Sequence, residues 1–236
     1  MSPLAKIIIL ILYGFDILFC TPTYTKKKYD HSTRTNKLVW KGIAIGIPLL
    51  ILVYGIICAV FSHMVVDFGD AMVYDDGTVG SYAYLLAAGM LVCAFADIIL
   101  EIKFIRGGVL FLLGHLIYVF AVLTYLGHIT TVTVVIYLVF AAAGTIATVD
   151  KLDSKYRIPL IGYNLVISGS FALGVTLMVT QTLPNMLLGL GMCFLVVSDW
   201  LLARNKMIGS NFKRSLVSLL FYFGGQTLIS TIIFFI

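Results

Sequence analysis

Charged residues are scarce in this sequence. Asp, Glu, Lys and Arg make up 11% of its 236 residues, whereas a soluble domain contains about a quarter. Hydrophobic residues account for 61%, and the mean hydropathy is +1.05. A chain of this composition cannot bury its apolar side chains in one water-soluble core. The scarcity of charge therefore excludes a soluble domain and predicts an integral membrane protein.

Cysteine motifs and metal-binding motifs are also lacking. The four cysteines lie in or at the ends of apolar segments, and no pair has Cys-x-x-Cys spacing. No His-Glu-x-x-His motif occurs either. We therefore expect single buried thiols, and neither a metal nor a cofactor. The net charge of +5 does not indicate a nucleic-acid partner, because basic loops beside an anionic lipid surface explain it.

What the sequence does contain is eight apolar stretches of the length that crosses a bilayer as a helix, about 20 residues. They cover residues 4–21, 39–61, 82–101, 107–126, 130–149, 158–180, 184–202 and 215–236. The stretches lack the period-2 alternation of barrel strands. The polar segment "TPTYTKKKYD", rather than a signal-peptide cleavage site, follows the first stretch. We predict an all-α polytopic membrane protein, with one bundle of eight transmembrane helices over residues 1–236.

The basic residues follow the same division. Fifteen of the 16 Lys and Arg residues lie in the odd-numbered loops between these stretches or, for Lys41, at the adjoining end of the second stretch, and Lys6 is the exception. Because cytoplasmic loops are enriched in Lys and Arg, both termini are expected outside the cell or in a lumen. The pattern fits the endoplasmic reticulum and the plasma membrane equally. The loop at 62–81 carries four aspartates instead, and we interpret it as a solvated loop.

Three aspartates interrupt the apolar stretches. Asp97 lies in "AFADIILEIKF" and Asp199 in "VVSDWLLARNKM", while Asp16 lies in the first stretch. An ionisable residue near the centre of a membrane helix costs at least ~2.5 kcal/mol, so such residues are functional candidates. Asp97 and Asp199 lie roughly 5–6 Å from the cytoplasmic helix end. At that depth a structural ion pair with a nearby Lys or Arg is an open alternative, and for Asp16 it is the favoured one.

Three further stretches have polar faces. His115 and Tyr118 are three residues apart and share a helix face, and Tyr163 and Asn164 lie in the sixth stretch. The eighth stretch has a polar residue at every fourth position: Ser218, Tyr222, Gln226 and Ser230. Lipid cannot satisfy such a stripe, so it must face protein or a water-filled cavity. Polar stripes also hold helices together, and that interpretation stays open.

The depths of these residues indicate one shared site. We expect Asp97 and Asp199 near the mouth of a cavity that opens to the cytoplasmic leaflet. The residues expected deeper in it are His115, Asn164, Tyr222 and Gln226. Such a cavity suits an amphiphile whose polar head rests among basic residues, namely Lys41, Arg106, Lys206 and Arg214. Two carboxylates in one low-dielectric site do not both stay ionised easily, which separates an acid from a base.

The segment "FADIILEIKFIRGGVLFLLGHLIYVFAV" resembles the YhhN family of lysoplasmalogenases. Its matching positions are Asp97, Phe104, Gly108, His115 and Tyr118. A second block of the family is matched by Ser198, Asp199, Asn205, Lys206, Tyr222 and Gln226, and Tyr163 fits a tyrosine of the sixth stretch. Ala96 stands where the family usually has glycine, and the element around Lys41 is less regular than in the family.

The resemblance implies hydrolysis of the vinyl ether bond of a lysoplasmalogen, which yields a fatty aldehyde and a glycerophospho-choline or -ethanolamine. It implies Asp97 and Asp199 as general acid and base, in an order left open. It also implies substrate contacts by Lys41, His115, Tyr118, Tyr163, Asn164, Ser198, Tyr222 and Gln226, without a cofactor. The implied partners are a lysophospholipid and the lipid bilayer.

Other functions fit parts of the same pattern. A proton-coupled transporter would use the aspartates and His115 as a relay, but Pro48 has no counterpart in the other half of the chain. An intramembrane aspartyl protease would carry Gly-x-Gly-Asp, whereas Asp97 follows "FA" and Asp199 follows "VS". A lipid-binding membrane protein without catalysis is the third alternative.

Overall fold

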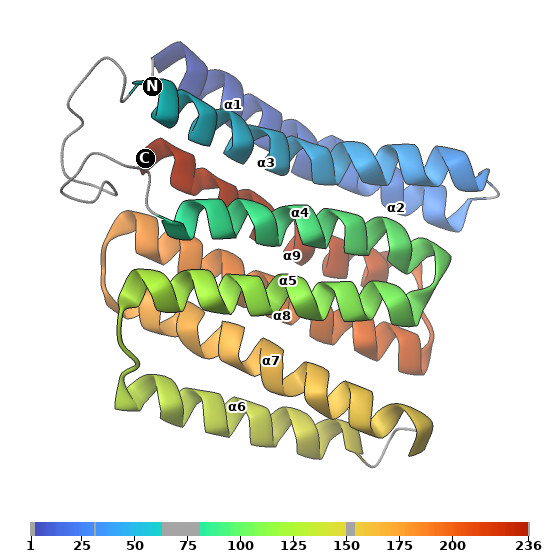
Figure 1. Ribbon diagram of the computed structural model, residues 1–236. Coiled ribbons are helices and arrows are strands. Elements are labelled where there is room, and N and C mark those ends of the chain that lie inside the picture. Colours follow the sequence, from blue (N-terminus) through green and yellow to red (C-terminus); the bar gives the residue numbers. More distant parts are fainter. Residues whose placement is uncertain (1–2, 31, 63–80, 150–153, 236) are drawn as a thin grey trace.

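Each of the eight apolar stretches forms a helix in the computed structural model (Figure 1). The structure describes residues 3–30, 32–62, 81–149 and 154–235, and within these ranges it contains no strand. The acidic loop predicted at 62–81 lies almost entirely outside the described residues. The elements are α1 (Pro3–Phe15), a π-helical turn (Asp16–Cys20), α2 (Thr21–Tyr29), α3 (Arg34–Ser62), α4 (Ser81–Ile102), α5 (Phe104–Leu126), α6 (Thr131–Val149), α7 (Ser154–Val179), α8 (Leu183–Ile208), α9 (Phe212–Ser230) and a 3-10 turn (Thr231–Phe235).

The first helical segment is longer than predicted. We expected the apolar stretch to end at residue 21, but helix continues through the polar segment to Tyr29. Two of the side chains in this extension, Tyr24 and Thr25, are buried. Three lysines, Lys26 to Lys28, occupy the last turn, where positive charge interacts favourably with the helix dipole. This extension, α2, reaches the predicted site.

The helix ends have local causes. Lys103 has an extended backbone and separates α4 from α5 by a single residue. Gly127 ends α5 in the left-handed region, with φ of 68°, where a residue without a Cβ has no steric cost. The side chain of Asn211 caps α9 by accepting a hydrogen bond from the Arg214 amide. The short α4–α5 turn makes these two helices antiparallel neighbours.

The bundle is assembled from neighbouring helices (Figure 1). The closest associations are α4 with α5, α8 with α9, and α7 with α8. The first three helices lie along one side, and α9 contacts α2 and α3. At the opposite side α6 packs mainly on α7. The candidate residues are therefore carried by helices that contact one another: α3, α4, α5, α7, α8 and α9.

Six helical segments of the described chain are long and apolar enough to cross a membrane. They are Pro3–Tyr29, Arg34–Cys58, Ser81–Ile102, Phe104–Leu126, Arg157–Val179 and Leu183–Lys206. The apolar part of α6, Thr131–Ala147, is shorter. Polar side chains such as Ser215, Ser218 and Gln226 lower the mean hydropathy of α9. The chain is thus a helical, multi-pass protein by composition and length, and the two spans expected at α6 and α9 stay a prediction.

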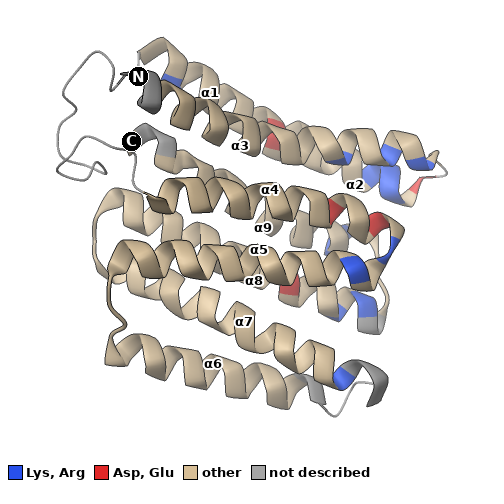
Figure 2. Ribbon diagram, in the orientation of Figure 1, with Lys and Arg blue, Asp and Glu red and all other residues tan. Residues whose placement is uncertain are grey.

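The charged residues are unevenly distributed along the bundle. Figure 2 shows that nearly all described Lys and Arg residues gather at the end farthest from the two chain termini. Lys6, the basic residue of α1, lies instead near the end of the bundle where the two termini are. This polarity is the arrangement that the alternation of basic loops predicts.

Candidate functional site

A cavity of about 230 Å³ lies among helices at the basic end of the bundle. Its walls come from α2, α3, α4, α5, α8 and α9. Half of the site residues expected from the sequence line it: Lys41, Asp97, Ser198, Asp199 and Tyr222. Leu100, Phe104, Phe111, Leu202 and Leu219 form its apolar wall. The structure therefore brings both candidate carboxylates to one cavity.

Asp97 forms a buried ion pair. It lies on α4 and is 4% exposed, and its Oδ1 is 2.8 Å from Nζ of Lys41 on α3. Lys41 is 2% exposed, and its Nζ also donates to the main-chain oxygen of Asp97, at 2.8 Å. The other carboxylate oxygen, Oδ2, is buried without a hydrogen-bond partner. A buried charge is stable only when it is paired and hydrogen-bonded, and Lys41 meets that need at Oδ1 of Asp97.

Two residues that the sequence did not identify complete this ion pair. Glu101 Oε2 lies 3.4 Å from Nζ of Lys41 and accepts a hydrogen bond of 3.1 Å from the Tyr24 hydroxyl. Nζ of Lys41 is also 5.5 Å from the centre of the Tyr24 ring, within the range of a cation–π contact. Glu101 follows Asp97 by one helical turn, a spacing that could have indicated it. Tyr24 lies in a polar segment that resembled a loop and carried no such signal.

Asp199 has different neighbours. It lies on α8 and is 6% exposed. Oδ2 accepts a hydrogen bond of 2.5 Å from the Tyr163 hydroxyl on α7 and lies 2.8 Å from Nε2 of His115 on α5. The other ring nitrogen of His115 is 3.1 Å from the hydroxyl of Ser170, another residue that the sequence did not identify. Three helices thus converge on one carboxylate oxygen, and His115 contacts Asp199 rather than Asp97.

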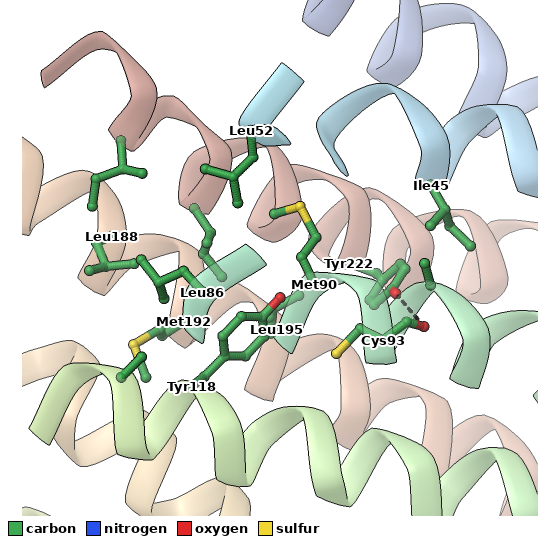
Figure 3. Close-up of a cluster of buried hydrophobic side chains, with 14 of the residues drawn as sticks. Ile45, Leu52, Leu86, Met90, Cys93, Tyr118, Leu188, Met192, Leu195 and Tyr222 are labelled. Carbon is green, nitrogen blue, oxygen red and sulfur yellow. Dashed lines mark hydrogen bonds between the residues drawn. The ribbon is translucent and has the colours of Figure 1, made fainter. Parts of the chain in front are cut away.

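The polar stripe of α9 bonds to several helices. Ser218 and Ser198 each donate to the other's main-chain oxygen, at 3.1 and 2.9 Å. Tyr222 donates to the main-chain oxygen of Cys93 on α4 at 3.4 Å, as the dashed line in Figure 3 shows. Gln226 accepts from Tyr118 at 2.9 Å. Much of the stripe therefore joins helices, the alternative that the sequence left open, and Tyr222 also faces the cavity.

Asn164 and two of the expected head-group residues lie elsewhere. The Asn164 amide donates to the main-chain oxygen of Ala141 at 3.0 Å and so joins α7 to α6, outside the cavity lining. Arg106 and Arg214 do not line the cavity either. Lys206 does, together with Lys28, which the sequence did not single out. Asn205, Ser210 and Ser215 also line the cavity.

The third intramembrane aspartate lies outside the cavity. Asp16 begins the π-helical turn and is fully buried, and neither carboxylate oxygen has a hydrogen-bond partner. None of the ion pairs among the described residues joins Asp16 to a Lys or Arg. The expected ion pair at Asp16 is therefore not found in this part of the chain, whereas Asp97 has one.

The arrangement provides two carboxylates with unlike surroundings. Asp97 has an ammonium group beside it, and Asp199 has a phenol and an imidazole. No group of three or more His, Cys, Asp or Glu residues in the described ranges is placed to hold a metal ion. What the site offers is acid–base chemistry in a largely apolar cavity.

Comparison with known proteins identifies one family. A model of the YhhN family matches residues 71–233. No curated protein and no solved structure matches. The matched segment contains both cavity aspartates and the two partners of Asp199, His115 on α5 and Tyr163 on α7. Tyr24, Lys28 and Lys41 precede it, so α2 and α3 add to the cavity from outside the matched segment.

Proposed function

The chain belongs to the YhhN family, and from this premise we propose that it is a lysoplasmalogenase-like hydrolase. Its substrate would be a lysoplasmalogen, and its products a fatty aldehyde and a glycerophospho-choline or -ethanolamine. The observation that supports this proposal most directly is that Asp97 and Asp199, from two helices about a hundred residues apart in the chain, line one cavity.

The chemistry of a vinyl ether requires such a pair. Nucleophiles do not attack this bond until its β-carbon has been protonated, which requires a general acid that is neutral near pH 7. The oxocarbenium ion that results is stabilised by a nearby negative charge. The second carboxylate supplies that charge and removes a proton from the attacking water. The hemiacetal then collapses to the aldehyde and the free glycerol hydroxyl.

The remaining lining suits an amphiphile. Lys28 and Lys206 at the mouth would attract the phosphate of the head group. Leu100, Phe104 and Leu202 provide an apolar path for the first carbons of the alkenyl chain. In this arrangement the two carboxylates are contacted by Lys41, Tyr163 and His115. The helices that carry the carboxylates are joined to their neighbours by Tyr118, Gln226 and Ser198.

We place the cavity at the cytoplasmic side of the membrane. Lys and Arg residues gather at its end of the bundle (Figure 2), which is the distribution of cytoplasmic loops. With α6 and α9 counted as spans, the chain crosses eight times and both termini lie on the other side. The prediction of eight spans is tested by glycosylation acceptor sites placed in each loop, which are modified only on the lumenal side.

The enzyme assay compares three aspartates of one membrane protein. The purified protein is mixed with lysoplasmenyl-ethanolamine, and released aldehyde is measured for the wild type and for Asp97→Asn, Asp199→Asn and Asp16→Asn. We expect the first two variants to lose activity by on the order of 10²–10⁴-fold. Asp16→Asn, which lies outside the cavity, should retain it. Folded wild type that releases no aldehyde would refute the activity, and full activity of Asp97→Asn or Asp199→Asn would refute the paired-carboxylate mechanism.

A further inference from the structure

The two cavity aspartates can be assigned separate roles. We propose that Lys41 is a positioning residue that keeps Asp97 ionised, so that Asp97 is the base of the reaction and Asp199 is its proton donor. This inference rests on the proposed hydrolysis of a vinyl ether. It also moves Lys41 from the substrate, where the sequence placed it, to the catalytic carboxylate.

The hydrogen-bonding capacity of Lys41 is fully used inside the protein. An ammonium group has three N–H donors. Its Nζ has three acceptors: Oδ1 and the main-chain oxygen of Asp97, both at 2.8 Å, and Oε2 of Glu101 at 3.4 Å. No donor is left for a substrate phosphate, and the side chain is 2% exposed. Lys41 therefore acts through Asp97.

Further contacts hold this arrangement in place. The Tyr24 hydroxyl donates to the same Glu101 oxygen that faces Lys41, at 3.1 Å, and the Tyr24 ring lies beside Nζ. Tyr24 and Lys41 come from α2 and α3, which precede the family match at residues 71–233. The counter-ion of one catalytic carboxylate is thus supplied by the part of the chain that the family model does not cover.

The ionisable neighbour of Asp199 is His115, which is a counter-ion only when its imidazole is protonated. None of the ion pairs found in the described ranges joins Asp199 to a Lys or Arg. Its Oδ2 accepts a hydrogen bond from the Tyr163 hydroxyl. It also accepts one from His115 in the tautomer that has its proton on Nε2, in which the other ring nitrogen accepts from the Ser170 hydroxyl. A neutral carboxyl group fits these contacts, because its carbonyl oxygen accepts both donors and its hydroxyl, on Oδ1, is free to face the cavity.

Charge decides which aspartate holds the proton. Two carboxylates that share a low-dielectric cavity take up a proton more readily than two isolated ones. The proton goes to the one whose negative charge is less well stabilised. An ammonium at 2.8 Å stabilises the Asp97 carboxylate, while Asp199 has only a phenol and an imidazole. The neutral acid is therefore Asp199.

The proton balance of the reaction then closes. The Asp199 hydroxyl gives its proton to the β-carbon of the vinyl ether, and the oxocarbenium ion forms near the Asp97 carboxylate. Water adds to this ion and gives one proton to Asp97. In the collapse of the hemiacetal, Asp97 returns that proton to the departing glycerol oxygen, and the hemiacetal hydroxyl gives its proton to Asp199. Both carboxyl groups end in their starting states.

The pH dependence reports on Asp97 and on the groups around it. These groups are Lys28 and Tyr24 of α2, Lys41 of α3, Glu101 of α4, Asp199 of α8 and Tyr222 of α9. Lys41 is the cation among them that directly contacts Asp97. Removal of its charge makes ionisation of Asp97 require a higher pH. In Lys41→Met the acidic limb of the kcat/KM profile should therefore move to higher pH by about 1–3 pH units.

Three variants separate this role from a structural one. Lys41→Arg keeps the charge and should keep the acidic limb of the kcat/KM profile close to its wild-type position. Lys37→Met, one turn earlier on the same helix and outside the cavity lining, should not move this limb. Lys41→Met combined with Asp97→Asn removes both charges of the buried pair. It leaves Glu101, which is partly exposed and keeps the hydrogen bond from Tyr24, and it should be no slower than Asp97→Asn alone. An unmoved limb in folded Lys41→Met, or a double variant at least tenfold slower than Asp97→Asn, would overturn the proposal.

Infrared spectroscopy tests the protonation states without any turnover. The measurement is made in an Asp16→Asn background, because Asp16 is also buried without a hydrogen-bond partner and would give a carboxylic acid band of its own. In this background the carboxylic acid C=O stretching band at neutral pH should disappear in Asp199→Asn and persist in Asp97→Asn. Lys41→Met should add a second such band, which the additional Asp97→Asn substitution removes. Loss of the wild-type band in Asp97→Asn instead would reverse the assignment. If the protein releases no aldehyde, the activity is refuted while these spectra still decide whether Lys41 holds Asp97 ionised.

Discussion

Two adjacent glycines at the start of α5 offer a sharp test of how the site is built. A Cβ added at Gly107 would lie 2.5 Å from Cα and 2.6 Å from the amide nitrogen of Leu100 on α4, whereas a Cβ added at Gly108 would meet nothing within 4 Å. The atoms near Gly107 are backbone atoms, so no side-chain rotation can relieve the overlap. Ordinary contact begins near 3.4 Å, so α4 and α5 must separate by about 0.9 Å.

The two Gly→Ala variants should therefore change stability in opposite directions. Gly107→Ala overpacks the contact between α4 and α5 and should lower the free energy of unfolding by about 1–3 kcal/mol. Gly108→Ala removes chain flexibility at no steric cost and should raise it by about 0.4–1 kcal/mol. Cys20, Cys93 and Cys193 are buried free thiols, so a thiol-reactive fluorophore can follow thermal unfolding in detergent.

The same pair of variants tests the site. Leu100 lines the cavity, and Asp97 precedes it by three residues on α4. A displacement of about 1 Å in a catalytic group can reduce activity by on the order of 100-fold, so Gly107→Ala should release aldehyde much more slowly and Gly108→Ala should match the wild type. Equal unfolding temperatures for the two variants would show that the α4–α5 contact is not as close as the structure has it, and the reasoning would fail.

Two further predictions concern a hydrogen-bond partner of Asp199 and one lysine that lines the cavity. Tyr163→Phe removes the hydroxyl that lies 2.5 Å from Asp199. This variant should lower the free energy of unfolding by about 1 kcal/mol and slow aldehyde release roughly tenfold. An unchanged rate would argue against a role for this contact. Lys206→Ala should raise KM for lysoplasmenyl-ethanolamine by a factor of roughly 2–5 with kcat unchanged, while Lys213→Ala, outside the cavity lining, serves as the control. A KM that Lys206→Ala leaves unaltered would remove this lysine from the head-group site.

The positions of the helices could be predicted because they depend on local composition. An apolar run of about 20 residues forms a helix in lipid whatever its neighbours are, since its backbone has no other partners there. The same reasoning identified Asp97 and Asp199, because a carboxylate in such a run is costly anywhere in the chain. It failed for α2, where the sequence is polar and the helix is supported by burial of Tyr24 and Thr25.

The contacts of the site depend on distant residues and could not be predicted. The sequence placed His115 near Asp97, through the short turn that joins their helices, but the structure pairs it with Asp199, 84 residues away. The same holds for Gly107 and Gly108, which are indistinguishable as neighbours in the chain although only one touches α4.

The sequence by itself thus determined a helical membrane protein with two costly carboxylates near one side of the bilayer, because hydropathy acts residue by residue along the chain. Only the tertiary structure decided that Lys41 and Glu101 surround Asp97 while Tyr163 and His115 bond to Asp199. The physical reason is that a charge is stabilised by whatever lies within a few ångströms of it. Which side chains those are depends on how the helices pack.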